Sequence, residues 1–309
     1  MIRCSVCIRI EPIYARRHSG ERLCKRCFLR SVEGKVRTTI GKYDMFEIDD
    51  RIAIAVSGGK DSVSLLHILS KIEQSFPKVS LCAITVDEGI AGYRDEAIGI
   101  AARNCADLGV EHIIVSFKEL FGCTMDGVVE KTKGRRLTPC AYCGVLRRRA
   151  LNIAAREAKA DKIATAHNLD DEVQTFLLNI IHGDSSRIFR SESVSDLAEA
   201  SFVPRVKPMS EVLEREVAFY AHLKHIPFQE MPCPYAADAL RNDVRRILNR
   251  LEEKHPGTKY TTYSSTERIR KAVKRTAKNM SLKKCKTCGE PTTGMTCQTC
   301  QLLHRLKQQ

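Results

Sequence analysis

Three groups of cysteines in this 309-residue chain have the spacing of metal ligands. Each group contains the pattern Cys-x-x-Cys, which places two thiolates on one side of a tight turn, and four thiolates complete the tetrahedral coordination of Zn²⁺. Two pairs near each terminus therefore predict two closed structural zinc sites. The expected ligands are Cys4, Cys7, Cys24 and Cys27 in the first site, and Cys285, Cys288, Cys297 and Cys300 in the second.

The third pair, Cys140 and Cys143, has no second pair beside it. Cys233 lies between two prolines, in a segment that can be neither regular helix nor regular sheet, and we expect it to complete this site. Three thiolates leave one position open, which suits a catalytic zinc ion or a [4Fe–4S] cluster. A third closed zinc site with His225 as its fourth ligand is an open alternative. The remaining cysteines are expected to be structural thiols: Cys82, Cys105 and Cys123.

The segment SGGKDS, residues 57–62, has the features of a phosphate-binding loop. It follows an apolar, β-branched run and precedes an amphipathic helical pattern, so its glycines can turn backbone N–H groups toward an anion at a helix N-terminus. Lys60 adds a full positive charge, and Asp61 is expected to hold Mg²⁺ or to orient the turn. The segment differs from the GxxxxGK[ST] loop, which the chain lacks. The expected phosphate-binding residues are Ser57, Gly58, Gly59, Lys60, Asp61 and Ser62.

A second polar segment, ATAHNLDDEVQT at residues 164–175, ends one predicted strand and opens a helix. His167 and Asp171 are expected to lie near the nucleotide, with Asp171 as a ligand of Mg²⁺. The alternative is helix capping by Asn168 or Asp170, because acidic residues favour the first turn of any helix. Asp87, which ends the strand LCAITVD, is a further nucleotide-binding candidate.

Strands and helices alternate around these motifs. Apolar runs predict strands at residues 52–56, 79–87, 111–117 and 162–166, and helical patterns begin near residue 62 and cover 94–108, 145–160 and 170–183. This order predicts an α/β fold with a parallel sheet whose ligands bind at the carboxyl ends of the strands. The expected organisation is a zinc module at 1–30, a linker helix at 31–50, a catalytic domain at 51–256, a basic linker and helix at 257–284 and a zinc module at 285–309.

The chain carries a formal net charge of +14, which indicates a polyanionic partner. Basic helical segments follow the cysteines of the third site, and we expect them to contact RNA, although charged helix faces are commonly only solvated. The chain has no signal-peptide pattern and no apolar run long enough to cross a bilayer, so no membrane association and a cytoplasmic location are expected. The expected RNA contacts are Arg147, Arg148, Arg241 and Arg245.

Together with SGGKDS, five further segments give the chain a specific resemblance: DEGIAGYRDEA, TMDGVV, CAYCGVLRRRALN, HNLDDEVQTFLLNIIHGD and CPYA. The chain resembles the tRNA 2-thiouridine synthetases of the PP-loop ATP pyrophosphatases, especially the cytoplasmic enzyme of eukaryotes and its archaeal counterpart. The similarity extends from the first cysteine module to the last. It implies an adenine nucleotide alpha hydrolase-like core and catalytic roles for Lys60, Asp61, Cys140, Cys143 and Cys233.

The resemblance also implies a reaction. ATP adenylates the C2 oxygen of a tRNA uridine, and a sulfur nucleophile then displaces AMP. The three cysteines are expected to hold a [4Fe–4S] cluster, and a persulfide relay on the same residues is the rival account. Expected partners are tRNA, a homodimer mate, and sulfide or a ubiquitin-like sulfur carrier. The modified nucleoside is expected at position 34, with 54 as the alternative.

Two other functions stay open on sequence alone. One is a zinc-module RNA-binding adapter with a vestigial nucleotide site, and the other is a PP-loop ligase that modifies RNA without sulfur. The intact SGGKDS segment argues against the first, and the three cysteines of the third site argue against the second. The related tRNA-cytidine thiolases generally lack paired terminal zinc modules, which favours uridine as the substrate.

Overall fold

The fold is known from a computed structural model that describes residues 2–76, 78–134, 137–183, 202–235, 240–274 and 283–308. At its centre is a five-stranded parallel sheet with the strand order β5-β4-β3-β6-β7. Ile54 of the central strand lies opposite Ala83 on one side and Ala164 on the other. The strands are β3 (Arg51–Ala55), β4 (Ser80–Asp87), β5 (Glu111–Ser116), β6 (Lys162–Ala164) and β7 (Arg205–Val206).

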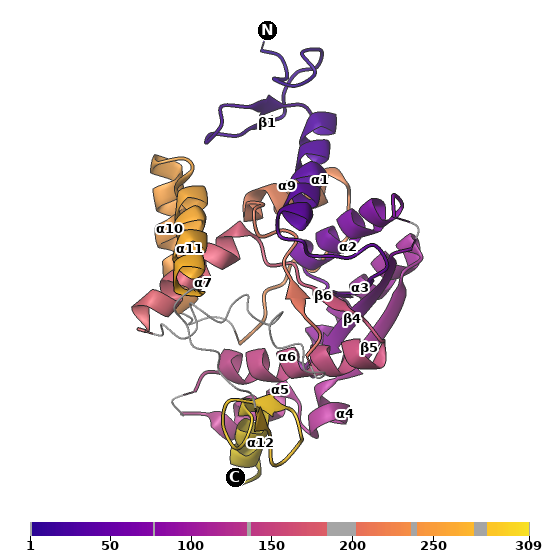
Figure 1. The fold of residues 1–309 in the computed structure, drawn as a ribbon, viewed down its shortest axis with the longest axis vertical. Helices are drawn as coiled ribbons and strands as arrows, with labels where there is room; N and C mark the ends of the chain where they lie inside the picture. Colours follow the sequence, from indigo (N-terminus) through magenta and orange to yellow (C-terminus); the bar gives the residue numbers. More distant parts are fainter. Residues whose placement is uncertain are drawn as a thin grey trace.

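Both faces of the sheet are buried at its central strands β3 and β4, because their side chains alternate between two separate apolar cores. Ile52 and Ile54 point into the first core, while Ala53 points into the second. The first core packs under α1 (Lys25–Lys42), α2 (Lys60–Glu73), α3 (Arg94–Leu108) and α9 (Glu214–Leu223). The second packs under α4 (Phe117–Phe121), α5 (Met125–Thr132) and α6 (Pro139–Glu157). The predicted α/β class with a parallel sheet is confirmed (Figure 1).

Three helices form a third packing unit beside the sheet (Figure 1). They are α7 (Leu169–Ile181), α10 (Leu240–Lys254) and α11 (Thr258–Lys274), and they share a small apolar core. A buried ion pair between Lys259 and Asp170 joins α11 to α7. Helix α11 falls within the expected basic linker at 257–284, of which residues 275–282 lie outside the described residues.

The two cysteine modules lie at opposite ends of the molecule (Figure 1). The first contains the hairpin of β1 (Tyr14–Ala15) and β2 (Arg22–Leu23) and continues directly into α1, which packs on α9. A buried ion pair of 2.7 Å between Arg16 and Glu216 fastens it to α9.

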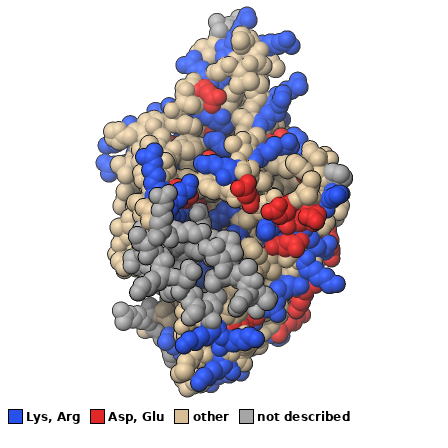
Figure 2. Space-filling view, viewed as in Figure 1, with Lys and Arg blue, Asp and Glu red and all other residues tan. Residues whose placement is uncertain are grey.

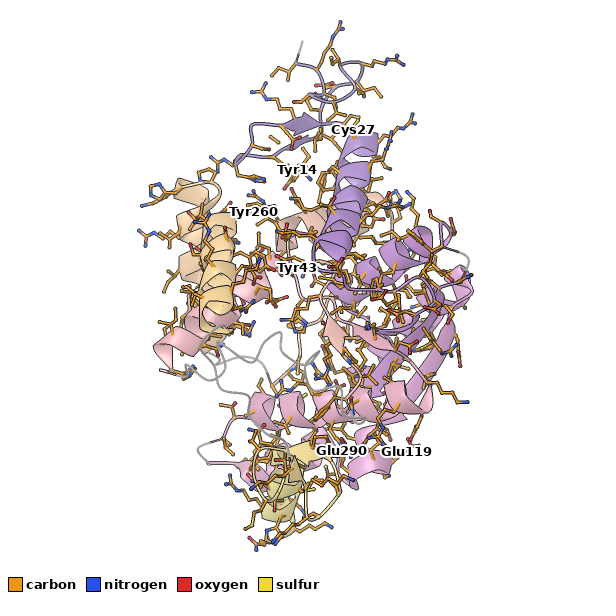
Figure 3. All side chains as sticks on the ribbon, viewed as in Figure 1. Tyr14, Cys27, Tyr43, Glu119, Tyr260 and Glu290 are labelled. Carbon is orange, nitrogen blue, oxygen red and sulfur yellow. The ribbon has the colours of Figure 1, made fainter. Side chains whose placement is uncertain are left out.

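The second module contains β8 (Lys283–Lys284), β9 (Pro291–Thr292) and α12 (Gln298–Lys307), and it packs against α6. Leu302 and Leu306 of α12 belong to the second core, and Glu290 forms ion pairs with Arg149 and Arg156 of α6 (Glu290 is labelled in Figure 3). The module is therefore part of the structure that supports α6.

Several element boundaries differ from those expected from the sequence. The helix expected at 31–50 is α1, which begins earlier and ends earlier, at Lys25–Lys42. Helix α6 begins at Pro139, six residues before the expected start, because Thr138 supplies an extended N-cap and proline fits the first helical position. Strand β7 was not predicted, since two residues are too short to produce an alternating pattern. None of the helices in the described ranges has the length and apolar character needed to cross a membrane.

Candidate functional site

The SGGKDS segment forms a compact turn between β3 and α2, as expected. The Ser57 N–H donates to Ser62 Oγ over 3.0 Å, and Ser62 Oγ donates to the Gly59 carbonyl over 2.9 Å. Gly58 has φ +87°, and a Cβ at this position would lie 2.5 Å from the Ala97 carbonyl oxygen. Gly59 caps α2 without a side-chain hydrogen bond, so the N–H groups of the first helical turn are directed to an incoming anion.

Lys60 sits between two carboxylates at this helix end. Its Nζ lies 2.8 Å from Asp61 Oδ2 and 2.9 Å from Glu214 Oε1. Burial opposes the charged ammonium, but the two carboxylates outweigh it and raise the pKa of Lys60. The side chain is therefore a permanent cation beside the turn. Arg245 Nη2 also binds Glu214, at 2.7 and 2.9 Å from its two oxygens.

Asp61 and Asp171 meet on the same side of the loop. Burial raises the pKa of Asp61, and the charge of Asp171 raises it further, while Lys60 opposes both effects. Burial likewise raises the pKa of Asp171. Asn168 links the two: its Nδ2 donates to Asp61 Oδ1 over 3.3 Å, and its Oδ1 accepts from the Asp171 N–H over 3.1 Å. Two partly exposed carboxylates that repel each other are suited to a divalent cation such as Mg²⁺, which needs only one or two protein carboxylates.

The capping alternative also holds for Asn168, which forms a capping box with Asp171 at the start of α7. His167 lies just before this cap, where its Nδ1 is 2.9 Å from Thr165 Oγ1. His167 itself is exposed, but the surrounding protein and the positive charges of Lys207 and Arg241 lower its pKa. Asp87 ends β4, the strand next to β3, and its Oδ1 accepts from the Gly89 N–H over 2.8 Å.

The three cysteines of the third site come together at the start of α6. Cys140 and Cys143 lie in its first turns, and Cys140 Sγ is 3.7 Å from the carbonyl oxygen of Tyr235, two residues after Cys233. The Tyr235 hydroxyl donates to Asp126 Oδ1 over 2.6 Å, which fixes this loop against α5. Burial raises the pKa of Cys143 to about 11, and the neighbouring thiols of Cys233 and Cys140 contribute to the increase, whereas Arg147 opposes it.

The spacing of these thiols differs from that of the terminal modules. With Zn–S bonds of about 2.3 Å, tetrahedral geometry places ligand sulfurs about 3.8 Å apart. Each terminal group has its four sulfurs within 4.8 Å of one another, with Cys7 and Cys24 at 3.8 Å and Cys288 and Cys297 at 3.6 Å. Among the described residues, the third site forms no such group, with or without His225. Its thiols are therefore not gathered as closely as a closed zinc site requires.

The arginines expected to contact RNA also have partners inside the protein. Arg147 binds Glu88, Arg241 Nη2 donates to Thr175 Oγ1, and Arg245 binds Glu214. Between 42% and 48% of each of the three side chains is exposed, so part of each faces solvent. These three arginines therefore bind residues inside the protein and also leave part of each side chain free to contact a partner. The backbone carbonyl of Arg148, the fourth, accepts a hydrogen bond from Arg205.

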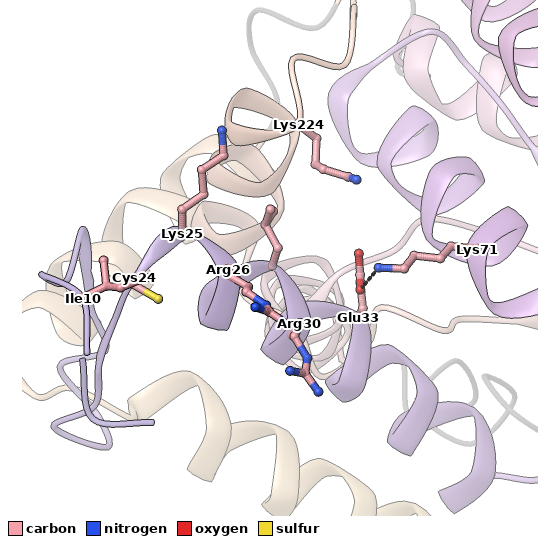
Figure 4. A pocket seen from close by; sticks show the side chains of 9 residues that line it. Ile10, Cys24, Lys25, Arg26, Arg30, Glu33, Lys71 and Lys224 are labelled. Carbon is pink, nitrogen blue, oxygen red and sulfur yellow. Dashed lines mark hydrogen bonds and ion pairs between the residues drawn. The ribbon is translucent and has the colours of Figure 1, made fainter. Parts of the chain in front are cut away.

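A basic pocket of about 520 Å³ between α1, α2 and α9 was missed by sequence reasoning (Figure 4). Its one acidic side chain, Glu33, is paired with Lys71 at 2.5 Å and accepts from the Tyr220 hydroxyl. The only sequence signal was the cluster of basic residues in α1. On the face shown in Figure 2, lysine and arginine gather toward both ends of the molecule, and acidic residues gather on one flank. The basic residues that line the pocket are Lys25, Arg26, Arg30, Lys71 and Lys224.

The parallel sheet and the glycine turn at the end of its central strand define a nucleotide-binding α/β domain with a separate cysteine site at the same edge. Residues 30–252 match the family model described as the PP-loop domain. The chain is 37% identical to the tRNA 2-thiolation protein NcsA of Haloferax volcanii over 99% of both chains. It is 35% identical to the cytoplasmic tRNA 2-thiolation protein 1 of Drosophila yakuba, over 96% of this chain and 85% of that one.

A solved structure agrees with these sequences. The U34-tRNA thiolase NcsA from Methanococcus maripaludis, described with its [4Fe–4S] cluster, superposes with a TM-score of 0.87 at 34% identity and covers 99% of this chain and 97% of that one. This chain therefore belongs to the tRNA 2-thiolation proteins of the PP-loop family. The resemblance noted from its motifs is confirmed.

Proposed function

We propose that this chain is an ATP-dependent tRNA 2-thiouridine synthetase, a tRNA sulfurtransferase that forms AMP and pyrophosphate. The observation that carries the proposal is the junction of the phosphate loop with the cysteine site. The N–H of Gln229 donates to the Gly58 carbonyl over 2.9 Å, and Cys233 follows four residues later. The full-length similarity to proteins described as tRNA 2-thiolation proteins supports the same activity.

The first step needs the phosphate loop. The uracil C2 oxygen attacks the α-phosphate of ATP, a phosphorus–oxygen bond forms, and pyrophosphate leaves. Lys60 and the N-terminus of α2 neutralise the charge that develops on the leaving group. Asp61 and Asp171 are the residues that would hold Mg²⁺ on the phosphates.

The second step needs the third cysteine site. A sulfur nucleophile attacks C2, a carbon–sulfur bond forms, and the bond from C2 to the adenylated oxygen breaks so that AMP leaves. Cys140, Cys143 and Cys233 are the residues that would hold a [4Fe–4S] cluster, since they offer three thiols at wider spacing than a zinc site. When bound, a cluster with one iron free of protein thiolate supplies a position for hydrosulfide. The second core and Tyr235 fix the cysteines in place.

The remaining parts of the proposal concern metals and partners. The terminal cysteine groups hold Zn²⁺, in keeping with their compact sulfur spacing. The basic pocket and the exposed arginines bind tRNA phosphates. Sulfide or the thiocarboxylate of a ubiquitin-like carrier supplies the sulfur to a cytoplasmic homodimer, and uridine 34 is the modified nucleoside.

The function is tested by the product it forms. Anaerobically purified protein is incubated with unmodified tRNA, ATP, Mg²⁺ and sulfide. The oligonucleotide fragments of the tRNA and the free nucleotides are then identified by mass spectrometry. We expect 2-thiouridine at position 34, with one AMP and one pyrophosphate for each sulfur incorporated. A modified base without sulfur would instead identify another PP-loop ligase, and the absence of any tRNA-dependent ATP cleavage would identify an RNA-binding adapter.

A further inference from the structure

Glu88 is a buried carboxylate between the phosphate loop and the cysteine site. It directly follows β4, and only 3% of its side chain is exposed. Its two oxygens bind two different arginines: Oε2 lies 2.7 Å from Arg94 Nε, and Oε1 lies 2.7 Å from Arg147 Nε. A buried carboxylate between two guanidinium groups fixes the position of both, because neither can move without leaving a charge unpaired.

Arg94 connects this carboxylate to the phosphate loop. Its Nη1 donates to the carbonyl oxygen of Ser57 over 3.0 Å, and its Nη2 donates to the carbonyl oxygen of Val86 over 2.7 Å. Arg94 begins α3 and is itself buried. Its guanidinium therefore holds the first residue of the phosphate loop against the end of the neighbouring strand.

Arg147 connects the same carboxylate to the sulfur site. It lies one helical turn after Cys143 on α6, and its Nη2 donates to Cys143 Sγ over 3.1 Å while its Nε binds Glu88. The fork of one guanidinium thus spans the carboxylate and the thiol, which a single ammonium group cannot do.

We propose that Glu88 is a positioning residue that couples the occupancy of the phosphate loop to the arrangement of Cys143, through Arg94 on one side and Arg147 on the other. When a nucleotide binds, the loop holds Ser57 in one position, Arg94 and Glu88 are held with it, and Arg147 is fixed over the sulfur. The coupling rests on the proposed function, because it orders the sulfur site only when ATP is present to activate the uridine. This coupling gives a role to Glu88, the glutamate of the DEGI segment that directly follows β4.

The test measures how fast Cys143 in the full-length chain is alkylated by iodoacetamide, with and without saturating α,β-methylene-ATP and Mg²⁺. This nucleotide resists cleavage at the α-phosphate, and its affinity is measured separately by calorimetry. Labelling is located by mass spectrometry in protein purified in air with both terminal modules metal-loaded. In the unsubstituted chain we expect the nucleotide to speed labelling of Cys143 by about fivefold or more, because the fixed guanidinium stabilises the thiolate that reacts with iodoacetamide.

Two substitutions break the coupling in different ways. Glu88→Gln keeps the shape but offers one oxygen to two arginines, and Arg147→Lys keeps the charge but not the fork. The Arg147 side chain is 47% exposed, so Arg147→Lys is expected to fold. This variant therefore still tests the coupling if Glu88→Gln does not fold. We expect the nucleotide to speed labelling by less than about twofold in both variants, with nucleotide affinity retained. Glu290→Gln is the matched control, because Glu290 also bridges two arginines of α6. These two arginines form no ion pair or hydrogen bond with the described phosphate loop, so the nucleotide should affect labelling in this variant as it does in the unsubstituted chain.

Each other outcome overturns the proposal. Slowing of Cys143 labelling by the nucleotide would mean that the nucleotide shields the sulfur directly. Equal acceleration in Glu88→Gln, Arg147→Lys and the unsubstituted chain would mean that the bridge is only structural. Nucleotide binding without any change in labelling would refute the coupling and leave the proposed function standing. Failure of the nucleotide to bind at all would refute the proposed function together with the coupling.

Discussion

Gly58→Ala should weaken nucleotide binding by roughly 100-fold, whereas Gly59→Ala, one residue further on, should bind nearly as well as the unsubstituted chain. Gly58 has φ +87°, which costs a residue with a Cβ about 1–2 kcal/mol, and the added methyl would lie 2.5 Å from the Ala97 carbonyl oxygen. The backbone must move to relieve this contact, and about 2–3 kcal/mol of lost binding corresponds to the expected factor. Gly59 has φ −78°, and its nearest new contact would be Ser57 Oγ at 3.5 Å.

Calorimetry with α,β-methylene-ATP measures the two affinities, and melting temperatures show whether each variant is folded. The adjacent position is a strict control, because both glycines lie in the same turn and differ in backbone conformation. Equal impairment of the two variants would show that any side chain in the turn blocks the nucleotide. Unimpaired binding by Gly58→Ala would show that the phosphates bind elsewhere.

Cys143→Ser should reduce tRNA thiolation by at least about 1,000-fold, since a serine hydroxyl ligates iron less well than a thiolate and cannot carry sulfur. ATP affinity and tRNA affinity should change little, because the phosphate loop and the basic pocket contain no part of this side chain. The measurement is the rate of 2-thiouridine formation in tRNA under anaerobic conditions.

Cys123→Ser is the matched control for this variant. Cys123 is also a partly buried thiol packed against the second core, but it lies between α4 and α5, outside the proposed site. Its variant should retain thiolation within a fewfold of the unsubstituted rate. Retained activity in Cys143→Ser, or equal loss in both variants, would remove Cys143 from the sulfur chemistry.

Local features of this molecule were predictable from the sequence. The strands are short apolar runs, the phosphate loop is six contiguous residues, and each terminal metal group repeats one motif within a short segment. Each of these signals comes from residues that are close together in the chain. A short stretch of sequence is therefore enough to show it.

Features that depend on distant segments were not predictable. Arg147 was expected to contact RNA, but its partner Glu88 lies 59 residues away, and nothing in either segment indicates that the two meet. The same is true of Gln229, whose N–H reaches Gly58 from the segment that carries Cys233. The basic pocket combines side chains from α1, α2 and the segment after α9, so no single stretch of sequence displays it.

Iron, acid-labile sulfide and zinc per chain, measured in anaerobically purified protein and in Cys233→Ser, show whether Cys140, Cys143 and Cys233 hold the sulfur-transferring centre. We predict about four iron, about four sulfide and about two zinc in the unsubstituted chain, and loss of the iron and sulfide but not of the zinc in the variant. Zinc alone in both proteins, even after anaerobic reconstitution with iron and sulfide, would contradict a cluster and favour a persulfide relay on the same cysteines.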